Sequence, residues 1–414
     1  MASKSKQNKI TRPQFPSDSS GIVVHISGGL GPDSGGARST IPWSVDALRS
    51  RGVDARLVSV SSQHDELPAQ LKKRLSFKRI ASLPTWREIL LPELHQELER
   101  ATEDADILHV HGLWSPLLLA ACAIGRRRRM PVILSPMGMV SSHALAQSRW
   151  KKLIFSWLLQ NRALSHVSCI HVTSSAEFRD SKQYFGDVPV ALIPHGVELP
   201  VAGEGPINRL PKAEAGRTIL FLGRVSPIKN IAALIEAWAR VEPAYPSAVL
   251  RIVGPQDKDY ATSLVKLAEH FELKRIFFEP PVDDEGRFAA FGQADVVVLP
   301  SHSESFGMSV AEALAFGRPV IVSDNTPWAN LVDQARCGWT AKGSPEDLAK
   351  AIAAALEKPK DELRDMGQAA QQFIEELDLT WVRNASQLQE VYQWCFGRSP
   401  QPKCVYAGDD VGEF

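Results

Sequence analysis

The sequence predicts an α/β protein with two doubly wound, Rossmann-like domains that face a central cleft. Short β-branched runs alternate with amphipathic stretches along nearly the whole chain, which is typical of parallel sheets covered by helices on both faces. The alternation stops once, at residues 199–217, and then starts again. The length of 414 residues is enough for two or three domains that each bury a core.

The first domain is predicted to span residues 21–198. Its strands are short and apolar, so each is expected to be buried on both faces. The stretches between them carry apolar residues at a helical period. The expected strands are Gly21–Ile26, Ala55–Val60, Ile107–Val110, Val132–Leu134, Cys169–Thr173 and Val190–Ile193, and the expected helices are Ser39–Ser50, Trp86–Thr102, Ala144–Leu164 and Ser175–Phe185.

Residues 199–217 hold three prolines and three glycines without a sustained period, so we interpret them as an interdomain linker. The second domain is predicted over residues 218–380, and the strand ends of both domains are expected to point at the cleft. Its expected strands are Thr218–Leu222, Val249–Val253, Ile276–Phe278, Val296–Leu299 and Pro319–Val322, and its expected helices are Ile231–Val241, Asp259–Phe271, Glu285–Ala294, Ser309–Phe316 and Pro345–Glu357.

The two ends of the chain show no regular pattern. Residues 1–20 are polar and basic, and we expect a disordered tail there. Residues 398–414 are also expected to be unstructured.

The charge balance excludes some classes of function. The chain carries 47 Lys+Arg and 47 Asp+Glu, so as a whole it is not a basic nucleic-acid binder. Residues 1–200 nevertheless carry a net +8 and residues 201–414 a net −8, which favours an anionic partner for the first half. A chance difference in surface charge between two domains would give the same balance.

Cysteine usage and hydropathy favour a cytoplasmic protein. The five cysteines form no C-x-x-C pair, which argues against a disulfide framework or a zinc knuckle and fits a reducing compartment. The most apolar stretch, Leu113–Gly125, is shorter than the ~20 residues of a spanning helix. The N-terminal residues lack the apolar core of a secretory signal.

Two cations follow the first strand of the second domain. Arg224 and Lys229 lie between the strand Thr218–Leu222 and the next expected helix. Cations at the carboxyl end of a strand can clamp an anion, and a guanidinium suits a pair of phosphate oxygens. The alternative is an ordinary loop with solvated charges.

A second segment makes that anion site credible. Residues 301–315 read SHSESFGMSVAEALA and follow the strand Val296–Leu299. We expect Ser303 or Ser305 to cap the next helix, so that backbone amides there form an anion site. Glu312 lies among apolar residues of that helix, so an open, solvated position is disfavoured; its carboxylate could hold a ribose, with Glu304 beside the sugar.

These motifs resemble the family 4 (group 1) retaining glycosyltransferases with the GT-B fold, especially those that build bacterial surface polysaccharides. The resemblance lies in LGRVSPIK, in Glu304 and Glu312 within ESFGMSVAEAL, and in AFGRPVIVSD. In the first domain HVHGLW, SPMGM and IPHGV fit as well. The resemblance covers about residues 21–397 and implies a hexosyltransferase type of enzyme that moves a sugar from a UDP- or GDP-linked donor.

The resemblance also implies roles for individual residues. Arg224 and Lys229 would bind the diphosphate and stabilise the leaving nucleotide. Glu304 would contact the donor sugar at an oxocarbenium-like transition state, and Glu312 would bind the ribose. Gly36, beside Gly35, would lie across the cleft near the diphosphate. The backbone around Ser305, Phe306, Gly307 and Met308 would hold phosphate or sugar hydroxyls.

The resemblance implies further that residues 381–397 form a last helix that crosses back onto the first domain, with Trp381 at its start. It implies no cofactor and no metal, because the cations would take the place of a metal. The D-x-D pairs at Asp104 and Asp257 are therefore set aside. The glycines of SGGLGPDSGG do not match G-x-G-x-x-G, which disfavours a nicotinamide enzyme.

One departure from the family pattern concerns Met137, in the SPMGM loop, where many members have a histidine beside the reacting sugar. Methionine cannot donate a hydrogen bond or exchange a proton. His109 and His111 are the nearest substitutes, and we expect them to face opposite sides of their strand. His111, nearer the loop, is the candidate for the cleft and for a catalytic role; local packing is the alternative.

The basic half includes a helical stripe at residues 149–159, RWKKLIFSWLL. The spacing favours a core-facing helix over a membrane face. The positive charge still favours contact with an anionic membrane surface at the inner face, which would suit a lipid-linked acceptor.

The resemblance therefore implies a glycosyltransferase that acts on a saccharide or lipid-linked acceptor, in surface polysaccharide biosynthesis. Two alternatives stay open. One is another enzyme on the same fold, such as a sugar-nucleotide epimerase or a phosphorylase. The other is a non-catalytic nucleotide-sugar binding protein, which Met137 motivates.

Overall fold

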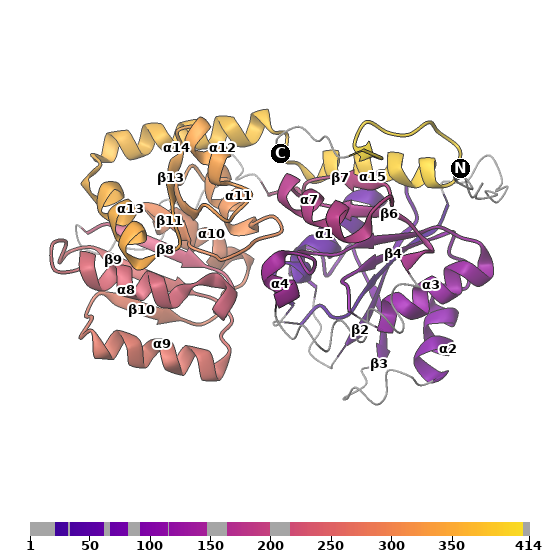
Figure 1. Cartoon of the computed structure of the whole chain (residues 1–414), viewed down its shortest axis with the longest axis horizontal. Helices are drawn as coiled ribbons and strands as arrows, with labels where there is room; N and C mark the ends of the chain where they lie inside the picture. Colours follow the sequence, from indigo (N-terminus) through magenta and orange to yellow (C-terminus); the bar gives the residue numbers. More distant parts are fainter. Residues whose placement is uncertain are drawn as a thin grey trace, which may run out of the picture.

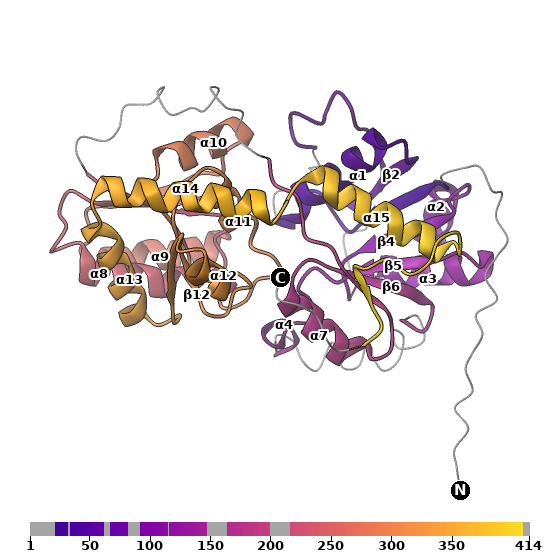
Figure 2. The ribbon, with the colours of Figure 1, turned by 90° about the horizontal axis from the view of Figure 1, so that it is seen from above.

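The computed structural model describes residues 21–31, 34–61, 67–81, 92–114, 116–146, 164–198 and 216–408. Two α/β halves lie side by side, each with its own sheet (Figures 1 and 2).

The first half is built on a sheet of eight strands in the order β14-β7-β6-β5-β4-β1-β2-β3. All neighbours pair in parallel except β14, which is antiparallel to β7. The central strands are buried almost throughout because helices cover both faces, as the continuous apolar runs predict. The strands are β1 Val23–Ser27, β2 Ala55–Ser61, β3 Phe77–Ala81, β4 Ile107–His111, β5 Val132–Ser135, β6 Val167–Val172, β7 Val190–Leu192 and β14 Val405–Tyr406.

The helices of the first half follow the strands in the alternation that the sequence shows. Ser174 begins α7 by accepting a hydrogen bond from the Glu177 amide, which satisfies one of the free amides of the first turn. The helices are α1 Ala37–Ser50, α2 Pro92–Ala101, α3 Pro116–Arg128, α4 Ser142–Ala146 and α7 Ser175–Phe185.

The second half is built on a fully parallel sheet in the order β10-β9-β8-β11-β12-β13. The order reverses at β8 and β11, and such a switch point is where doubly wound sheets bind ligands. The strands are β8 Thr218–Leu222, β9 Val249–Val253, β10 Ile276–Glu279, β11 Val296–Leu299, β12 Val320–Ser323 and β13 Gly338–Ala341.

Among the helices of the second half, α10, α11, α12 and α13 contact strands of this sheet, whereas α14 packs on α11 and α8 packs on α9 and α13. Their positions match the expected ranges to within two residues at each end where a helix was expected, and α12 and α14 were not expected. The helices are α8 Ile231–Val241, α9 Lys258–His270, α10 Asp284–Gln293, α11 Met308–Ala315, α12 Ala329–Gln334, α13 Pro345–Glu357 and α14 Lys360–Glu376.

The last helix, α15 (Trp381–Cys395), leaves the second half and packs on α1 of the first (Figure 2). Asn384 fixes this packing from inside: it accepts a hydrogen bond from Ser44 Oγ at 2.9 Å and donates one to the Pro194 carbonyl at 2.7 Å. Tyr392, further along α15, reaches the centre of the first half.

Some expectations from the sequence differ from the structure. The segment after Arg398, expected to be unstructured, contains β14, because Val405 and Tyr406 pair with the open edge of β7. A strand of two residues is too short to show an alternation of apolar and polar residues, so no pattern could have predicted it. The edge strands β3 and β13 were also not expected.

Other expectations lie outside the described residues. These are the tail 1–20, the linker 199–217 except its last two residues, and most of the helix Ala144–Leu164 with its stripe at 149–159. Within the described part of the chain, no helix combines the length and the apolar character needed to cross a bilayer.

Candidate active site

The neighbouring strands β8 and β11 of the second sheet bring Lys229 and Glu304 together. Lys229 lies in a short 3-10 turn after β8, and Glu304 lies in the loop after β11. Lys229 Nζ is 2.5 Å from Glu304 Oε1, and Ser301 Oγ donates to the same oxygen at 2.6 Å. Both charged side chains are largely buried, at 18% and 10% exposure. The two strand ends at the switch point thus hold a cation and a carboxylate in contact.

Arg224 lies at the same edge and faces the other half of the molecule. A Cβ added at Gly35 would lie 4.0 Å from Arg224 Nε. Gly35 has a φ of +58° and Gly36 begins α1, with no atom within 4 Å of an added Cβ. The loop before α1 therefore leaves open space opposite the cation, where an anion could be held between the halves.

The loop 301–307 is shaped differently from the expectation. Neither Ser303 nor Ser305 caps α11; the helix begins after Gly307, which has a φ of +86°. Trp328 Nε1 donates to the Phe306 carbonyl at 2.5 Å, and the Phe306 ring is buried against Trp328. A buried indole thus fixes the backbone here in place of a serine cap.

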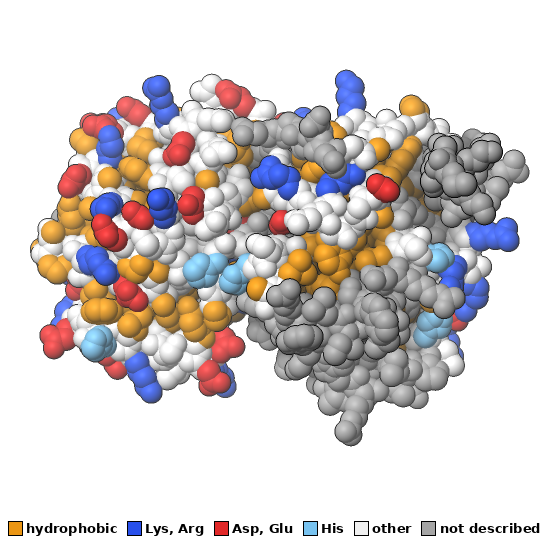
Figure 3. Space-filling view, in the orientation of Figure 1, with side chains coloured by type: hydrophobic (Ala, Val, Ile, Leu, Met, Phe, Trp, Pro, Cys, Tyr) orange, Lys and Arg blue, Asp and Glu red, His pale blue; other side chains and the backbone are white. Residues whose placement is uncertain are grey.

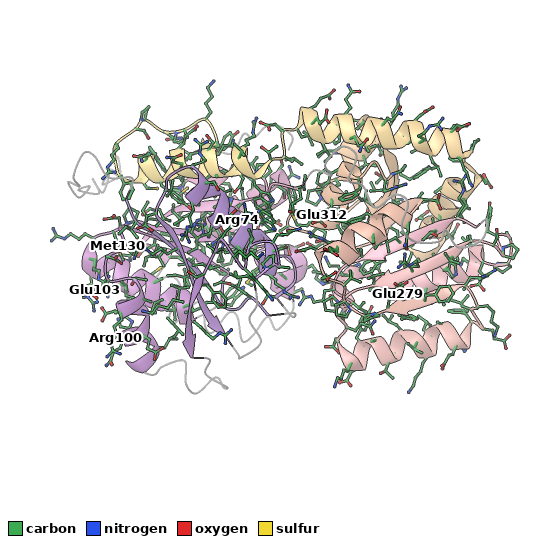
Figure 4. The ribbon with its side chains drawn as sticks, turned by 180° about the vertical axis from the view of Figure 1, so that it is seen from behind. Arg74, Arg100, Glu103, Met130, Glu279 and Glu312 are labelled. Atoms are coloured by element: carbon green, nitrogen blue, oxygen red, sulfur yellow. The ribbon has the colours of Figure 1, made fainter. Side chains whose placement is uncertain are left out.

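Glu312 is buried on α11, with 7% exposure, near the junction of the two halves (Figure 4). Its Oε1 is 2.5 Å from Arg287 Nη1 on α10. The same guanidinium is 3.2 Å from Asp284 and 3.2 Å from Glu198, which comes from the first half. One arginine is thus shared by three carboxylates.

The shared arginine leaves these carboxylates incompletely compensated. Burial raises the pKa of Glu198 to about 7, and the charge of Arg287 opposes this only in part. Burial likewise raises the pKa of Glu312, again against the attraction of Arg287. The site therefore holds two carboxyl groups, Glu198 and Glu312, whose pKa values are raised because burial disfavours their charged forms.

A loop of the first half packs against loop 301–307 of the second. A Cβ at Gly138 would lie 3.2 Å from Ser305 Cβ, and Thr173 Oγ1 lies 3.4 Å from the Ser305 carbonyl. The buried carboxylate of Glu177 holds both first-half segments: it accepts from the Gly138 amide at 2.6 Å and from the Thr173 amide at 2.9 Å. Met137, just before Gly138, has a φ of +54° and packs against the core.

Aromatic rings form a further set of contacts across the junction. His195 packs edge-on against Phe306 with ring centroids 5.5 Å apart, and burial lowers the pKa of His195 to about 3. His143 on α4 stacks on His302 at 5.7 Å. Histidine side chains are visible on the surface where the two halves meet (Figure 3).

The expectation that His109 and His111 face opposite sides of β4 is wrong. Side chains two residues apart lie on the same face of a strand, and the two rings stack with centroids 4.5 Å apart. His25 of β1 joins them, with Nδ1 3.0 Å from His111 Nε2. His109 is fully buried and hydrogen-bonded at both nitrogens, whereas His111 at the strand end is only partly buried.

A metal could be held at one place among the described residues, where nitrogens of His25, His109 and His111 lie within 4.8 Å of one another. The two D-x-D pairs serve other purposes. Asp104 pairs with Arg56 at 2.8 Å, and Asp257 caps α9.

Sequence reasoning missed Arg287, Glu198, Glu177 and Tyr392. Arg287 stands in no motif, and its approach to Glu312 depends on how α10 and α11 pack. Glu177 lies three positions after the Ser174 cap, a spacing that is typical of a helix start. That local role gives no sign of its contact with the loop at Gly138.

Comparisons with known proteins identify the family of this chain. The family model described as "Glycosyl transferases group 1" matches residues 207–373, and that of the "Glycosyl transferase 4-like domain" matches residues 35–196. The chain belongs to the group 1 glycosyltransferases. The two matches fall on the two halves and include Arg224, Lys229, Glu304 and Glu312, whereas Glu198 lies between the matched ranges.

Two curated relatives of this glycosyltransferase are informative. The phosphatidyl-myo-inositol mannosyltransferase of Mycobacterium tuberculosis is 28% identical over 88% of this chain and 94% of its own. The D-inositol 3-phosphate glycosyltransferase of Nocardia farcinica is 26% identical over 72% of this chain and 68% of its own. The chain is thus a glycosyltransferase, as predicted.

Solved structures confirm the GT-B fold. Sucrose-phosphate synthase from Thermosynechococcus elongatus superposes with a TM-score of 0.74 at 20% identity and covers 91% of this chain and 100% of that one. Anabaena HepE in complex with UDP and glucose has a TM-score of 0.73 at 17% identity, with 90% and 100% covered.

Proposed function

We propose that this glycosyltransferase transfers a hexose from a nucleotide-diphosphate donor to a saccharide or lipid-linked acceptor, with retention of the anomeric configuration. The observation that carries the proposal is the Lys229–Glu304 contact at the switch point of the second sheet, with Arg224 facing Gly35 across the junction. The HepE complexes hold UDP and UDP-glucose, which supports a nucleotide-sugar donor.

Each junction residue has a part in the proposed reaction. Arg224 and Lys229 bind the diphosphate and stabilise the charge that grows on it as the glycosidic bond breaks. Glu304, now paired with Lys229, faces the positive charge that develops on the sugar ring. Glu312 holds the ribose hydroxyls once it is released in part from Arg287. The loop around Ser305, Phe306, Gly307 and Met308 binds sugar or phosphate oxygens, and Gly36 lets α1 approach the diphosphate.

The proton of the acceptor hydroxyl passes to the leaving phosphate oxygen in this proposal. One bond forms between the acceptor oxygen and the anomeric carbon on the face from which the nucleotide leaves, and the bond to the phosphate oxygen breaks. The cation pair makes a metal unnecessary. The proposed place of action is the cytoplasm, at the inner membrane face, and the relative that acts on phosphatidylinositol supports a lipid-linked acceptor. A part in surface polysaccharide assembly belongs to the same proposal.

The experiment is to follow UDP- and GDP-hexoses by proton NMR, first alone and then with candidate acceptors. We expect slow release of free hexose whose first-formed anomer matches the donor, and its loss in Glu304→Gln. An inverted first product would contradict retention. Formation of an isomerised sugar nucleotide would favour an epimerase. Donor binding without any turnover, in the wild type, would favour a binding protein.

A further inference from the structure

A continuous chain of hydrogen bonds runs through the first half, from His111 at the end of β4 to the Ile193 carbonyl. Every member between these two ends is buried, with 0–4% exposure. In the first part of the chain, His111 Nε2 is 3.0 Å from His25 Nδ1, His25 Nε2 is 3.2 Å from Tyr392 Oη, and Tyr392 Oη is 2.8 Å from His109 Nδ1. In the second part, His109 Nε2 is 2.8 Å from Ser135 Oγ, Ser135 Oγ is 2.9 Å from His171 Nδ1, and His171 Nε2 is 3.1 Å from the Ile193 carbonyl oxygen.

The carbonyl of Ile193 at the far end fixes the direction of the three bonds nearest to it. A carbonyl oxygen only accepts, so His171 Nε2 carries a proton and donates to Ile193. A neutral imidazole has one N–H, so His171 Nδ1 must accept, and the Ser135 hydroxyl donates to it. That hydroxyl has no second proton, so Ser135 Oγ accepts from His109.

The same reasoning continues to the near end. His109 Nε2 donates, so His109 Nδ1 accepts from the Tyr392 hydroxyl. Tyr392 has then used its proton and accepts from His25 Nε2. His25 Nδ1 is therefore an acceptor, and His111 Nε2 must donate to it.

We propose that this chain locks His111 in the Nε2–H tautomer and presents the lone pair of its Nδ1 as a hydrogen-bond acceptor. Among the residues that the structure describes, none hydrogen-bonds this nitrogen, and His111 is the one partly exposed member of the chain. A carbonyl cannot take up a transferred proton, so the chain orients His111 and does not conduct protons.

The argument requires neutral imidazoles, and the surroundings provide them. Burial lowers the pKa of His25 to about 3 and that of His171 to about 4, and it also holds the pKa values of His109 and His111 well below the ordinary value. At neutral pH each ring therefore carries one proton.

Tyr392 is thus a positioning residue contributed by α15, the helix that crosses over from the second half. The tautomer of His111 follows from the structure alone. A second part of the proposal rests on the proposed function. In it, His111 Nδ1 accepts a hydrogen bond from a sugar hydroxyl, in the half of the molecule where Met137 stands at the position of the usual histidine.

The tautomer is tested directly by long-range nitrogen–proton NMR on the wild-type protein, with His111→Asn to assign the signals. We expect a bare Nδ1 and a protonated Nε2 for His111 at pH 7. Tyr392→Phe removes the central link, and we expect a mixture of tautomers. Tyr245→Phe, at a partly buried tyrosine of the second half whose hydroxyl donates to Glu357, should leave the His111 signals unchanged. A protonated Nδ1 in the wild type would overturn the proposal.

The same nitrogens offer a rival use, as ligands of a transition metal. Titration of the wild-type protein with ZnCl2, followed by calorimetry, separates the two. We expect no zinc-binding heat that depends on His25 or His111, so the titration curves of the wild type, His25→Asn and His111→Asn should agree. A stoichiometric site lost in both variants would overturn the proposal, because a metal would then occupy the lone pairs that the chain assigns to hydrogen bonds.

A matched pair of variants tests the second part of the proposal. The carboxamide of His111→Asn ends near the position of Nδ1 and can still accept there, whereas that of His111→Gln ends near Nε2. We expect His111→Asn to keep at least tenfold more kcat/KM than His111→Gln. Equal losses with an unchanged wild-type tautomer would overturn the hydroxyl contact and leave the tautomer lock standing; absence of any turnover would instead contradict the proposed function.

Discussion

At the scale of single residues, the candidate site depends on charges that compensate one another. Lys229 and Glu304 are in contact and mostly excluded from water, so removing either leaves the other buried without its partner. Burying an unpaired charge is more unfavourable than replacing both charges by neutral groups. The stability of the site and its chemistry therefore rest on the same pair.

Lys229→Met is predicted to lower the free energy of unfolding by about 1–3 kcal/mol, because the Glu304 carboxylate loses its cation. Adding Glu304→Gln should restore part of this loss while transfer activity stays absent. Urea unfolding of both single variants and the double variant measures the coupling. Strictly additive losses would show that the two side chains do not interact.

Gly36→Ala separates stability from function. No atom lies within 4 Å of the added Cβ and φ is −60°, so the folded chain accepts alanine without strain. We predict unchanged or slightly higher stability, by up to ~1 kcal/mol, together with weaker donor binding because the methyl group occupies the approach to the diphosphate. Thermal unfolding and calorimetry give the two values; unchanged donor affinity would remove Gly36 from the site.

At the scale of elements, the crossing between the halves is closely packed. The segment 194–197 passes against the start of α15, where a Cβ on Gly196 would lie 2.3 Å from the Trp381 amide nitrogen. The Val197 amide also donates to the Leu379 carbonyl at 2.9 Å. Where the chain passes between the halves, the segment at 196–197 and the segment at 379–381 are thus in direct contact.

Gly196→Ala is predicted to destabilise the protein by about 1–3 kcal/mol, because backbone atoms must move to admit the methyl group. Gly408→Ala is the matched control, since nothing lies within 4 Å of its added Cβ. Chemical denaturation of the two variants makes the comparison. Equal stability would mean that the crossing can relax at no cost.

The elements also show what a sequence can and cannot predict. The bounds of β8, β9, α8 and α13 agree with the expected ranges. Short continuous apolar runs specify the two strands, a strongly apolar face specifies α8, and the Ser344 cap specifies the start of α13. The same reading missed β14, whose two residues form a strand only because β7 offers an edge. At the site, Glu304 and Lys229 were both predicted as residues of the donor site. The Arg287–Glu312 contact was not predicted, because it depends on how two helices pack. The faces of His109 and His111 on their strand were assigned wrongly.

At the scale of the whole molecule, Arg287 links the halves through Glu198. The pKa of Glu198 is raised to about 7 because burial outweighs the shared attraction of Arg287. The unfolded chain loses this proton near pH 4.5, before the folded chain does. The contribution of Glu198 to stability is therefore fully present below about pH 4.5 and is lost as the pH rises through about 7.

Glu198→Gln should remove this dependence. We predict that the variant is more stable than the wild type at pH 8, by about 1–3 kcal/mol, and that this advantage disappears at pH 4.5. Melting temperatures of both proteins across this range make the test. A constant difference at every pH would contradict the raised pKa.

The central claim, that the junction binds a nucleotide-diphosphate sugar through Arg224 and Lys229, is tested most directly by calorimetric titration with UDP, GDP, ADP and their hexose conjugates. The account predicts that one nucleotide binds, that Arg224→Ala weakens it by about 10–100-fold, and that Arg240→Ala on the outer end of α8 does not. A folded protein that binds none of them, or that binds one equally well without Arg224, would contradict it.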